Sequence, residues 1–213
     1  MGRLRFFLSY LQSTDIFIMR FSAIAASILA LVTITAAGAE PAAADMTSMT
    51  LESRQVAQDL LKKLGGTLQA EMKANGAEAG IKVCREVASS MALQASLDKG
   101  WKVARVGTRT RNNLVGTPDA WEQAVLESFN KRMAAGEKIE TLEQMQIVEE
   151  PSGRSFRYMK AIGTQPQCLA CHGPQDQIAP GVKAALGQAY PHDQATGYTA
   201  GQLRGAVTIK RPL

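Results

Sequence analysis

Residues 144–162 read QMQIVEEPSGRSFRYMKAI, and this stretch decides the fold class. Gln144–Glu149 and Ser155–Ile162 have the residue types of short strands, and the Pro151-Ser152-Gly153 segment between them is typical of a tight turn. The pattern therefore predicts an antiparallel hairpin. Because hairpins and short connections favour antiparallel sheets, we expect an α+β fold in which helices pack on one side of the sheet.

Helical patterns precede the hairpin. From Thr50 onward, apolar residues recur every four positions and predict a first helix. This stripe consists of Val56, Leu60, Leu64, Leu68 and Met72. Asn75 followed by Glu78 resembles a capping box, which predicts the start of a second helix that ends near Gly100. The apolar face of the second helix carries Ile81, Cys84, Val87 and Met91.

A third helix and two further strands complete the pattern. The segment Thr117-Pro118-Asp119 has the residue types that begin a helix, with Pro118 at its first position, and Gly136 marks the end. Trp101–Val106 and Gly205–Lys210 have the composition of strands. The predicted order is helix, helix, strand, helix, hairpin, loop and strand.

Composition excludes several classes of protein. Of the 213 residues, 46% are hydrophobic and 20% are charged, and the net charge is +5. The hydrophobic content is too high for intrinsic disorder. The charge is too small and too dispersed to indicate a nucleic-acid partner. Since a long apolar run occurs once, near the N-terminus, a multi-span membrane protein is also excluded.

The N-terminal apolar run is typical of a secretory signal peptide. Residues 21–39 read FSAIAASILALVTITAAGA, follow the basic Arg20 and end in a small-x-small cleavage site. We predict a signal peptide over residues 1–39, a leader over 40–49 and one domain over 50–213. Met19 is a more ordinary start for such a segment than Met1, and an uncleaved anchor is the alternative. Export to the periplasm would leave no stable membrane span after cleavage and a mature chain with a net charge of +3.

Residues 168–172 read Cys-Leu-Ala-Cys-His, the attachment sequence for c-type haem. In such a site each thiol adds across a haem vinyl group, and the adjacent histidine binds the iron. Cys168 and Cys171 are therefore predicted to form the two thioethers of one covalent haem c, with His172 as an axial ligand. This ligation takes place outside the cytoplasm, in agreement with the predicted export.

Three other uses of the cysteines compete with haem attachment. A redox dithiol usually begins a helix after a strand, whereas this motif follows Gln165-Pro166-Gln167. A zinc site would combine Cys84, Cys168, Cys171 and one histidine. A disulfide between Cys168 and Cys171 would close a strained small ring. Because all five positions of the motif match, haem is favoured over these alternatives.

The other axial position of the iron has several candidate ligands. Cys84 remains unpaired, either as a buried core residue of the second helix or as a thiolate on the iron. His192, Met159 and Met145 are further candidates, because imidazole and thioether groups also bind haem iron. His192 also fits a surface loop between Pro191 and Asp193. Residue types alone leave Cys84, His192 and a methionine open.

The haem motif belongs to a longer series of residues. Cys84 and Pro118-Asp119-Ala120-Trp121-Glu122 lie upstream, and Tyr190-Pro191-x-Asp193-x-Ala195-x-Gly197-Tyr198 and Arg204-Gly205-Ala206 lie downstream. Over residues 50–211 this series resembles the family of exported single-haem c-type proteins with a PAS-like domain. The resemblance implies a PAS-like antiparallel sheet flanked by helices, thioethers at Cys168 and Cys171, and axial ligation of the iron by His172 and a Cys84 thiolate.

One segment departs from the family pattern. The family usually has Arg-Asn-Pro, whereas Arg111-Asn112 is followed here by Asn113-Leu114. Two interpretations of Arg109 and Arg111 stay open. They either contact buried haem propionates or belong to a solvated basic loop.

The expected function is that of a periplasmic haem protein that senses redox state or a small diatomic gas. The resemblance favours sensing because the family domain also occurs attached to signalling modules. A simple one-electron carrier, like a monohaem cytochrome c, is the alternative. We expect no enzyme activity, since a thiolate would fill the sixth coordination position of the iron. The expected partners are a redox partner protein or a diatomic ligand.

Overall fold

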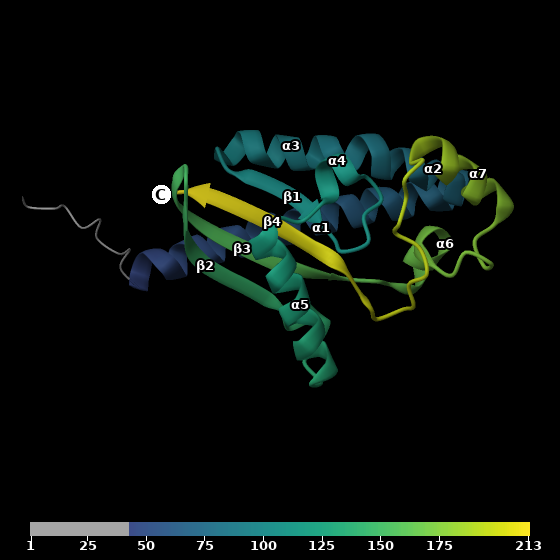
Figure 1. Cartoon of the computed structure of the whole chain (residues 1–213). Coiled ribbons are helices and arrows are strands. Elements are labelled where there is room, and N and C mark those ends of the chain that lie inside the picture. The colour runs from purple at the N-terminus through teal and green to yellow at the C-terminus, as the bar shows by residue number, and fades with distance from the viewer. Residues whose placement is uncertain (1–42) are drawn as a thin grey trace, which may run out of the picture. The chain divides into compact units, whose positions relative to one another are not determined.

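The predicted hairpin forms one edge of a four-stranded antiparallel sheet (Figure 1). The computed structural model describes residues 43–213. Strand β2 (Glu143–Glu150) pairs with β3 (Gly153–Gly163), β3 pairs with β4 (Leu203–Pro212), and β4 pairs with β1 (Lys102–Val106). The strand order is β1-β4-β3-β2, and all pairs are antiparallel. These elements confirm the α+β class.

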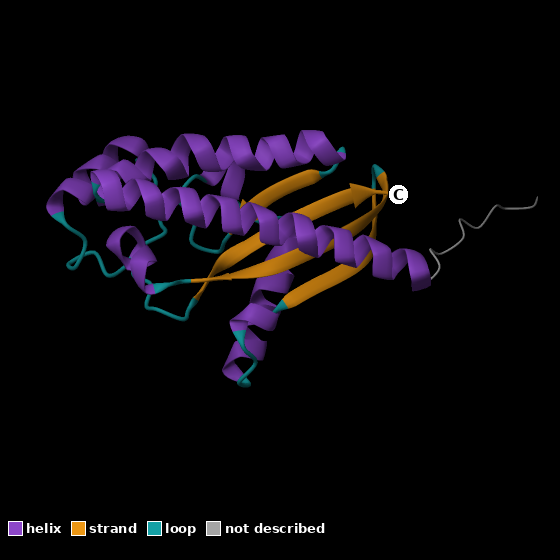
Figure 2. Cartoon of the chain, turned by 180° about the vertical axis from the view of Figure 1, so that it is seen from behind, coloured by secondary structure: helices purple, strands orange, loops and turns teal. Residues whose placement is uncertain are grey.

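Helices cover both faces of the sheet, so the expectation of helices on one side was wrong. Helix α1 (Ala43–Asn75) lies across one face and α5 (Ala120–Ala134) across the other (Figures 1 and 2). Successive residues of a strand point to opposite faces. Phe156 and Tyr158 of β3 pack in the cluster that contains α1 residues, whereas Met159 packs in the cluster that contains α5 residues. The sheet is therefore the middle of three layers.

The first helix is longer than its apolar stripe predicts. Residues 43–49, expected to be a leader, belong to α1, and Met49 is buried against the sheet. At the other end, Asn75 is the last residue of α1 and its amide donates to Glu71 Oε1 at 2.8 Å. The predicted capping box at Asn75 is wrong, because Gly76, with a φ of 85°, separates α1 from α2 (Ala77–Lys82).

The predicted second helix consists of three helical segments. Helix α2 is followed by a π-helical turn, Val83–Val87, and by α3 (Ala88–Lys99). The helix ends at Gly100, as the sequence predicted, and Gly100 adopts the left-handed conformation with a φ of 69°. Cys84 lies in the π-helical turn, where each N–H bonds one residue further back than in an α-helix.

The third predicted helix begins two residues later than expected. Asp119, rather than Thr117, is the N-cap of α5, and it forms a capping box with Glu122. The Asp119 side chain accepts from Glu122 N–H at 2.9 Å, and Glu122 Oε2 accepts from Asp119 N–H at 2.9 Å. Pro118 therefore precedes the helix, and its missing N–H leaves no helical bond unmade.

Three short helices were not predicted: α4 (Asn113–Gly116), α6 (Leu169–His172) and α7 (Pro180–Ala189). Helices α2, α6 and α7 gather at one end of the sheet, away from the C-terminus (Figure 1). There Val182 and Leu186 of α7 pack with Ile81 of α2. Cys171 of the haem motif packs against the same cluster, so this segment lies against residues of the helix that precedes Cys84.

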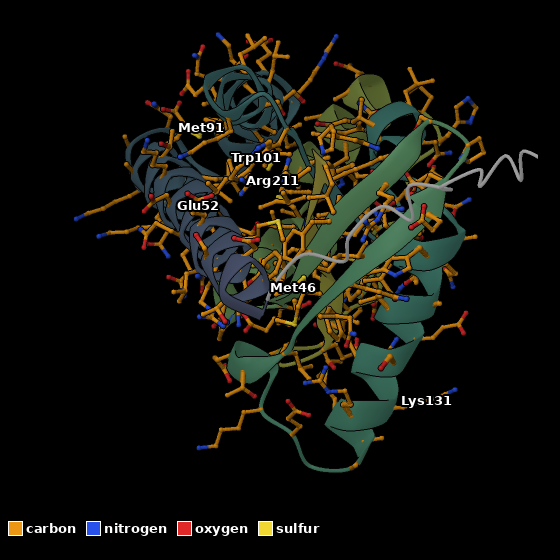
Figure 3. All side chains as sticks on the ribbon, turned by 90° about the vertical axis from the view of Figure 1, so that its left-hand side faces the viewer. Met46, Glu52, Met91, Trp101, Lys131 and Arg211 are labelled. Atoms are coloured by element: carbon orange, nitrogen blue, oxygen red, sulfur yellow. The ribbon has the colours of Figure 1, made fainter. Side chains whose placement is uncertain are left out.

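Arg211 near the end of β4 connects the sheet to α1. Its guanidinium donates to Glu52 Oε2 of α1 at 2.7 Å and lies 4.7 Å from the centre of the Trp101 ring. Figure 3 labels these three residues. The signal segment predicted for residues 1–39 lies outside the described residues. Within residues 43–213, no helix is both long and apolar enough to cross a bilayer.

Candidate functional site

A cavity of about 330 Å³ is lined by residues of both α2 and α6. Its volume is within the range of about 300–1,000 Å³ that is usual for small-molecule sites. One part of the cavity wall is mostly apolar and is formed by residues of α1 and α2. These apolar residues include Leu61, Leu64, Leu68, Met72 and Ile81. Such a surface fits a hydrophobic ligand.

The two cysteines and the histidine of the haem motif, Cys168, Cys171 and His172, line this cavity. A single 3₁₀ turn, Pro166–Cys168, leads into α6, so Cys168 precedes α6 while Cys171 and His172 lie within it. Pro166 stands at the first position of the turn, where its missing N–H costs no bond. Cys84, Cys168 and Cys171 are all free thiols, so the Cys168–Cys171 disulfide is not formed.

The His172 imidazole is held in one tautomer. Its Nδ1 lies 2.6 Å from the carbonyl oxygen of Ala195. A carbonyl can only accept, so Nδ1 carries the proton and Nε2 of the neutral ring keeps its lone pair. Burial, together with the nearby Arg111 and Arg204, lowers the pKa of His172 to about 2. The ring is therefore neutral, as a metal-binding imidazole must be.

Cys84 lines the same cavity as His172. The other predicted axial candidates lie elsewhere: Met145 packs on the α1 side of the sheet, Met159 is buried on the α5 side, and His192 is exposed in a loop. Of the four candidates, the structure brings Cys84 to the cavity with His172. Burial raises the pKa of the Cys84 thiol, while Arg105, Arg111 and Arg204 act in the opposite direction.

Met72 is a cavity residue that the sequence reasoning assigned only to an apolar stripe. It packs against Gly80, where an added Cβ would lie 2.8 Å from Met72 Cγ and 3.1 Å from Leu68 Cδ1. The glycine thus allows α2 to approach α1 closely, immediately before the π-helical turn that carries Cys84. The Met72 thioether is a further group that can bind haem iron, so an experiment on the axial ligand has to distinguish Met72 from Cys84.

Three arginines line the cavity: Arg105, Arg111 and Arg204. Arg111 pairs with Asp193, but among residues 43–213 neither Arg105 nor Arg204 forms an ion pair with a carboxylate. Burial lowers the pKa of both guanidinium groups. Both residues are partly buried, and a cation that loses water without meeting an anion carries a desolvation cost, so these two residues point to an acidic ligand in the cavity. Neither arginine was predicted as a site residue, although Arg204 was part of the series that carries the family resemblance.

Arg109 has a different place from Arg111. Its guanidinium lies 3.6 Å from the centre of the Tyr198 ring and donates to the carbonyl oxygen of Thr196 at 2.8 Å. It is not part of the cavity wall, so it supports the neighbouring loop instead. Arg111 therefore lies at the cavity and Arg109 against an aromatic ring, and contact with a propionate stays a prediction.

The predicted zinc alternative lacks its ligand set. Among the described residues, no three His, Cys, Asp or Glu side chains form a group that could hold a metal ion directly. Cys84 and the haem motif line a common cavity without forming such a group. Cys84 and the haem motif could therefore share one metal only within a larger cofactor that occupies the cavity.

Comparisons with known proteins agree with the fold. The solved structure described as "Crystal structure of the cyanobacterial heme-protein Tll0287" matches with a TM-score of 0.57 and 22% sequence identity. The match covers 81% of this chain and 97% of that one, and at this identity it shows a common fold. The comparison with curated proteins gave no significant match. The model of the Tll0287-like family matches residues 26–212, nearly the whole chain, and the protein therefore belongs to the Tll0287-like family.

Proposed function

We propose that this protein binds one covalent haem c in the cavity, through thioethers at Cys168 and Cys171 and with His172 and Cys84 as the axial ligands of the iron. The observation that carries the proposal is the convergence of Cys84 with the complete Cys-x-x-Cys-His motif on one cavity. The solved relative is itself described as a heme-protein, which supports a haem cofactor here.

The residues present fit a haem group. The apolar part of the wall matches the faces of a porphyrin, and the free thiols and the neutral imidazole match its vinyl groups and iron. Haem also carries two propionates, and the partly buried Arg105 and Arg204 supply cations that have no carboxylate partner among residues 43–213. When bound, the haem supplies an iron that changes its oxidation state by one electron.

The chain's own groups then determine the behaviour of that iron. Cys84 would bind as an anionic thiolate, which favours the ferric state and lowers the reduction potential, since axial ligands move haem potentials over about 0.8 V. Binding requires loss of the thiol proton, and Arg105, Arg111 and Arg204 favour the deprotonated form electrostatically. The apolar wall around Cys84 restricts the access of water.

We further propose that the protein is exported to the periplasm and works as a PAS-like sensor of redox state or of a small diatomic gas, without enzyme activity. The signal-like segment supports export, and the antiparallel sheet flanked by helices supports the PAS-like assignment. Loss or exchange of Cys84 would release the π-helical turn between α2 and α3 and so change a helix that packs against α1. The partners are a diatomic ligand or a redox protein.

The first experiment tests the haem and its ligands. The exported protein is denatured on a gel and stained for haem, and the ferric protein is examined by EPR. We expect covalent haem and a thiolate-type low-spin spectrum that Cys84→Ser abolishes. Met72→Leu is the matched control, because it changes the other soft donor of the cavity and should leave the spectrum unchanged. Loss of the spectrum in Met72→Leu but not in Cys84→Ser would reassign the ligand.

A second experiment separates sensing from plain electron transfer. After reduction, CO or NO should bind the iron and shift the absorption spectrum, because the thiolate is expected to leave ferrous iron. A spectrum that stays six-coordinate and unchanged under both gases would argue against gas sensing. It would leave the one-electron carrier as the better description.

A further inference from the structure

Asp193 and Arg111 form a buried ion pair beside the proposed iron ligand. Their side chains are 11% and 8% exposed, and Arg111 Nε lies 3.0 Å from Asp193 Oδ2. The second carboxylate oxygen, Oδ1, accepts from Ala195 N–H at 2.8 Å. Asp193 therefore does two things at once, because it anchors Arg111 and it folds the backbone that leads to Ala195.

The Arg111 guanidinium joins this loop to the haem motif. Its Nη2 lies 2.5 Å from the carbonyl oxygen of Cys171 and 3.3 Å from that of Ala195. One planar group thus holds three acceptors, which a lysine ammonium on a flexible stem would not hold in the same fork. The two carbonyls belong to the two segments that meet at His172.

The Ala195 carbonyl is the acceptor for His172 Nδ1, at 2.6 Å. Two backbone hydrogen bonds hold the same segments together. Gly197 N–H donates to the carbonyl oxygen of Gly173 at 2.8 Å, and Tyr198 N–H donates to the carbonyl oxygen of His172 at 2.9 Å. These bonds fix the separation of the loop and the motif. The direction of the Ala195 carbonyl depends in addition on the Asp193 side chain, which holds the N–H of Ala195.

We propose that Asp193 and Arg111 are positioning residues that orient the His172 imidazole through the Ala195 carbonyl. The inference rests on the proposed haem function and identifies how the chain controls one axial ligand. The N–H···O bond at Nδ1 fixes the plane of the ring and increases the electron density at Nε2. Arg111 donates to the same carbonyl oxygen and so limits how strongly that oxygen accepts from the imidazole.

The test uses two conservative variants and one control in the same loop. Asp193→Asn keeps an oxygen that accepts from Ala195 N–H but removes the charge that holds Arg111. Arg111→Lys keeps the positive charge but loses the fork. Thr196→Ala is the control, because the Thr196 hydroxyl contacts Gln175 at 3.3 Å and takes no part in the Asp193–Arg111–Ala195 contacts.

Three readouts are taken on the exported holoprotein: haem staining after denaturation, the ferric EPR g values with their line widths, and the thermal midpoint. We expect Asp193→Asn and Arg111→Lys to retain covalent haem but to show shifted g values and broadened lines. Thr196→Ala should match the wild type. If Arg111→Lys fails to mature, Asp193→Asn decides.

The outcomes separate this inference from the proposed function. A wild-type protein without covalent haem overturns the proposed function. A wild-type protein with haem, together with variants whose g values and line widths are unchanged, overturns the positioning role. That conclusion would hold even if the variants had lower thermal midpoints, because a purely structural ion pair would affect stability alone.

Discussion

Arg157 in β3 offers the sharpest test of the energetics of the fold. Its side chain is 3% exposed and lies under α5, where it meets three carboxylates: Asp119 at 2.7 Å, Glu122 at 3.0 Å and Glu150 at 3.3 Å. Glu122 is 2% exposed. The perturbation is Arg157→Met, which keeps much of the side-chain volume and removes the charge.

The expected loss follows from what the substitution leaves behind. Glu122 would keep its hydrogen bonds from Thr208 Oγ1 and from Asp119 N–H, but it would have no cation. Removing one member of a buried ion pair costs about 3–5 kcal/mol. In a domain of this size each kcal/mol lowers the thermal midpoint by about 2–4 °C, so a decrease of about 6–20 °C is expected.

The assay is thermal unfolding of the holoprotein followed by circular dichroism, with Arg132→Met as the matched control. Arg132 pairs with Glu137 at the solvent-exposed end of α5, where screening weakens the pair, so the control should lose much less. The double variant Arg157→Met, Glu122→Gln should be more stable than Arg157→Met, because it removes the stranded charge. An Arg157→Met midpoint no lower than that of Arg132→Met would refute the reasoning, as would a double variant that is less stable still.

Three further predictions follow from other parts of the molecule. Gly205→Ala should prevent accumulation of folded haem protein, because Gly205 has a φ of 156° and an added Cβ would overlap the Val106 carbonyl. Gly65→Ala is the control and should be tolerated, because Gly65 has open space around it. Haem staining quantifies both variants. Arg105→Gln should lower the reduction potential in spectroelectrochemistry, since loss of a cation from the cavity wall favours ferric iron. Arg109→Gln, outside the cavity wall, should change the potential less. The hydrogen bond from Arg54 lowers the pKa of Glu143, so the stability that Glu143 confers is present above its unfolded-state pKa of 4.5 and is lost as the pH falls through the lower folded-state pKa. Thermal midpoints measured at pH 3 to 7 should therefore fall on the acid side, and less steeply in Glu143→Gln; equal slopes would contradict the assignment.

Local signals explain which elements the sequence predicted. The hairpin was found because its two strands and turn are adjacent in the chain, and the haem motif because its five residues are contiguous. The helical layer that contains α5 was missed because the local pattern of β3 points the other way. Ser155 and Arg157 alternate with Phe156 and Tyr158, which is typical of a strand with one apolar face, yet residues 155–159 are all buried because Arg157 meets carboxylates under α5.

Other parts of the site depend on contacts between distant segments. Arg105 and Arg204 come from β1 and β4, and their common place in the cavity wall follows from the pairing of those strands. Asp193 was quoted as part of a motif, but its partner Arg111 lies 82 residues earlier. The helix α7 was missed because its apolar face becomes buried only when α2 packs against it.

The π-helical turn around Cys84 has a consequence for how this chain tolerates insertions and deletions. A π turn accommodates one residue more than an α-helical turn, so the helix over Val83–Val87 contains one residue beyond a regular spacing. Because the π turn absorbs this extra residue locally, deletion of one residue between Cys84 and Ala88 would restore regular α-helical bonding with little rotation of α2 relative to α3. The same deletion inside α3 meets no π turn and would rotate the residues before it by about 100° relative to those after it. The π-helical turn is therefore the point in this helix where a change of one residue in length disturbs the cavity wall least.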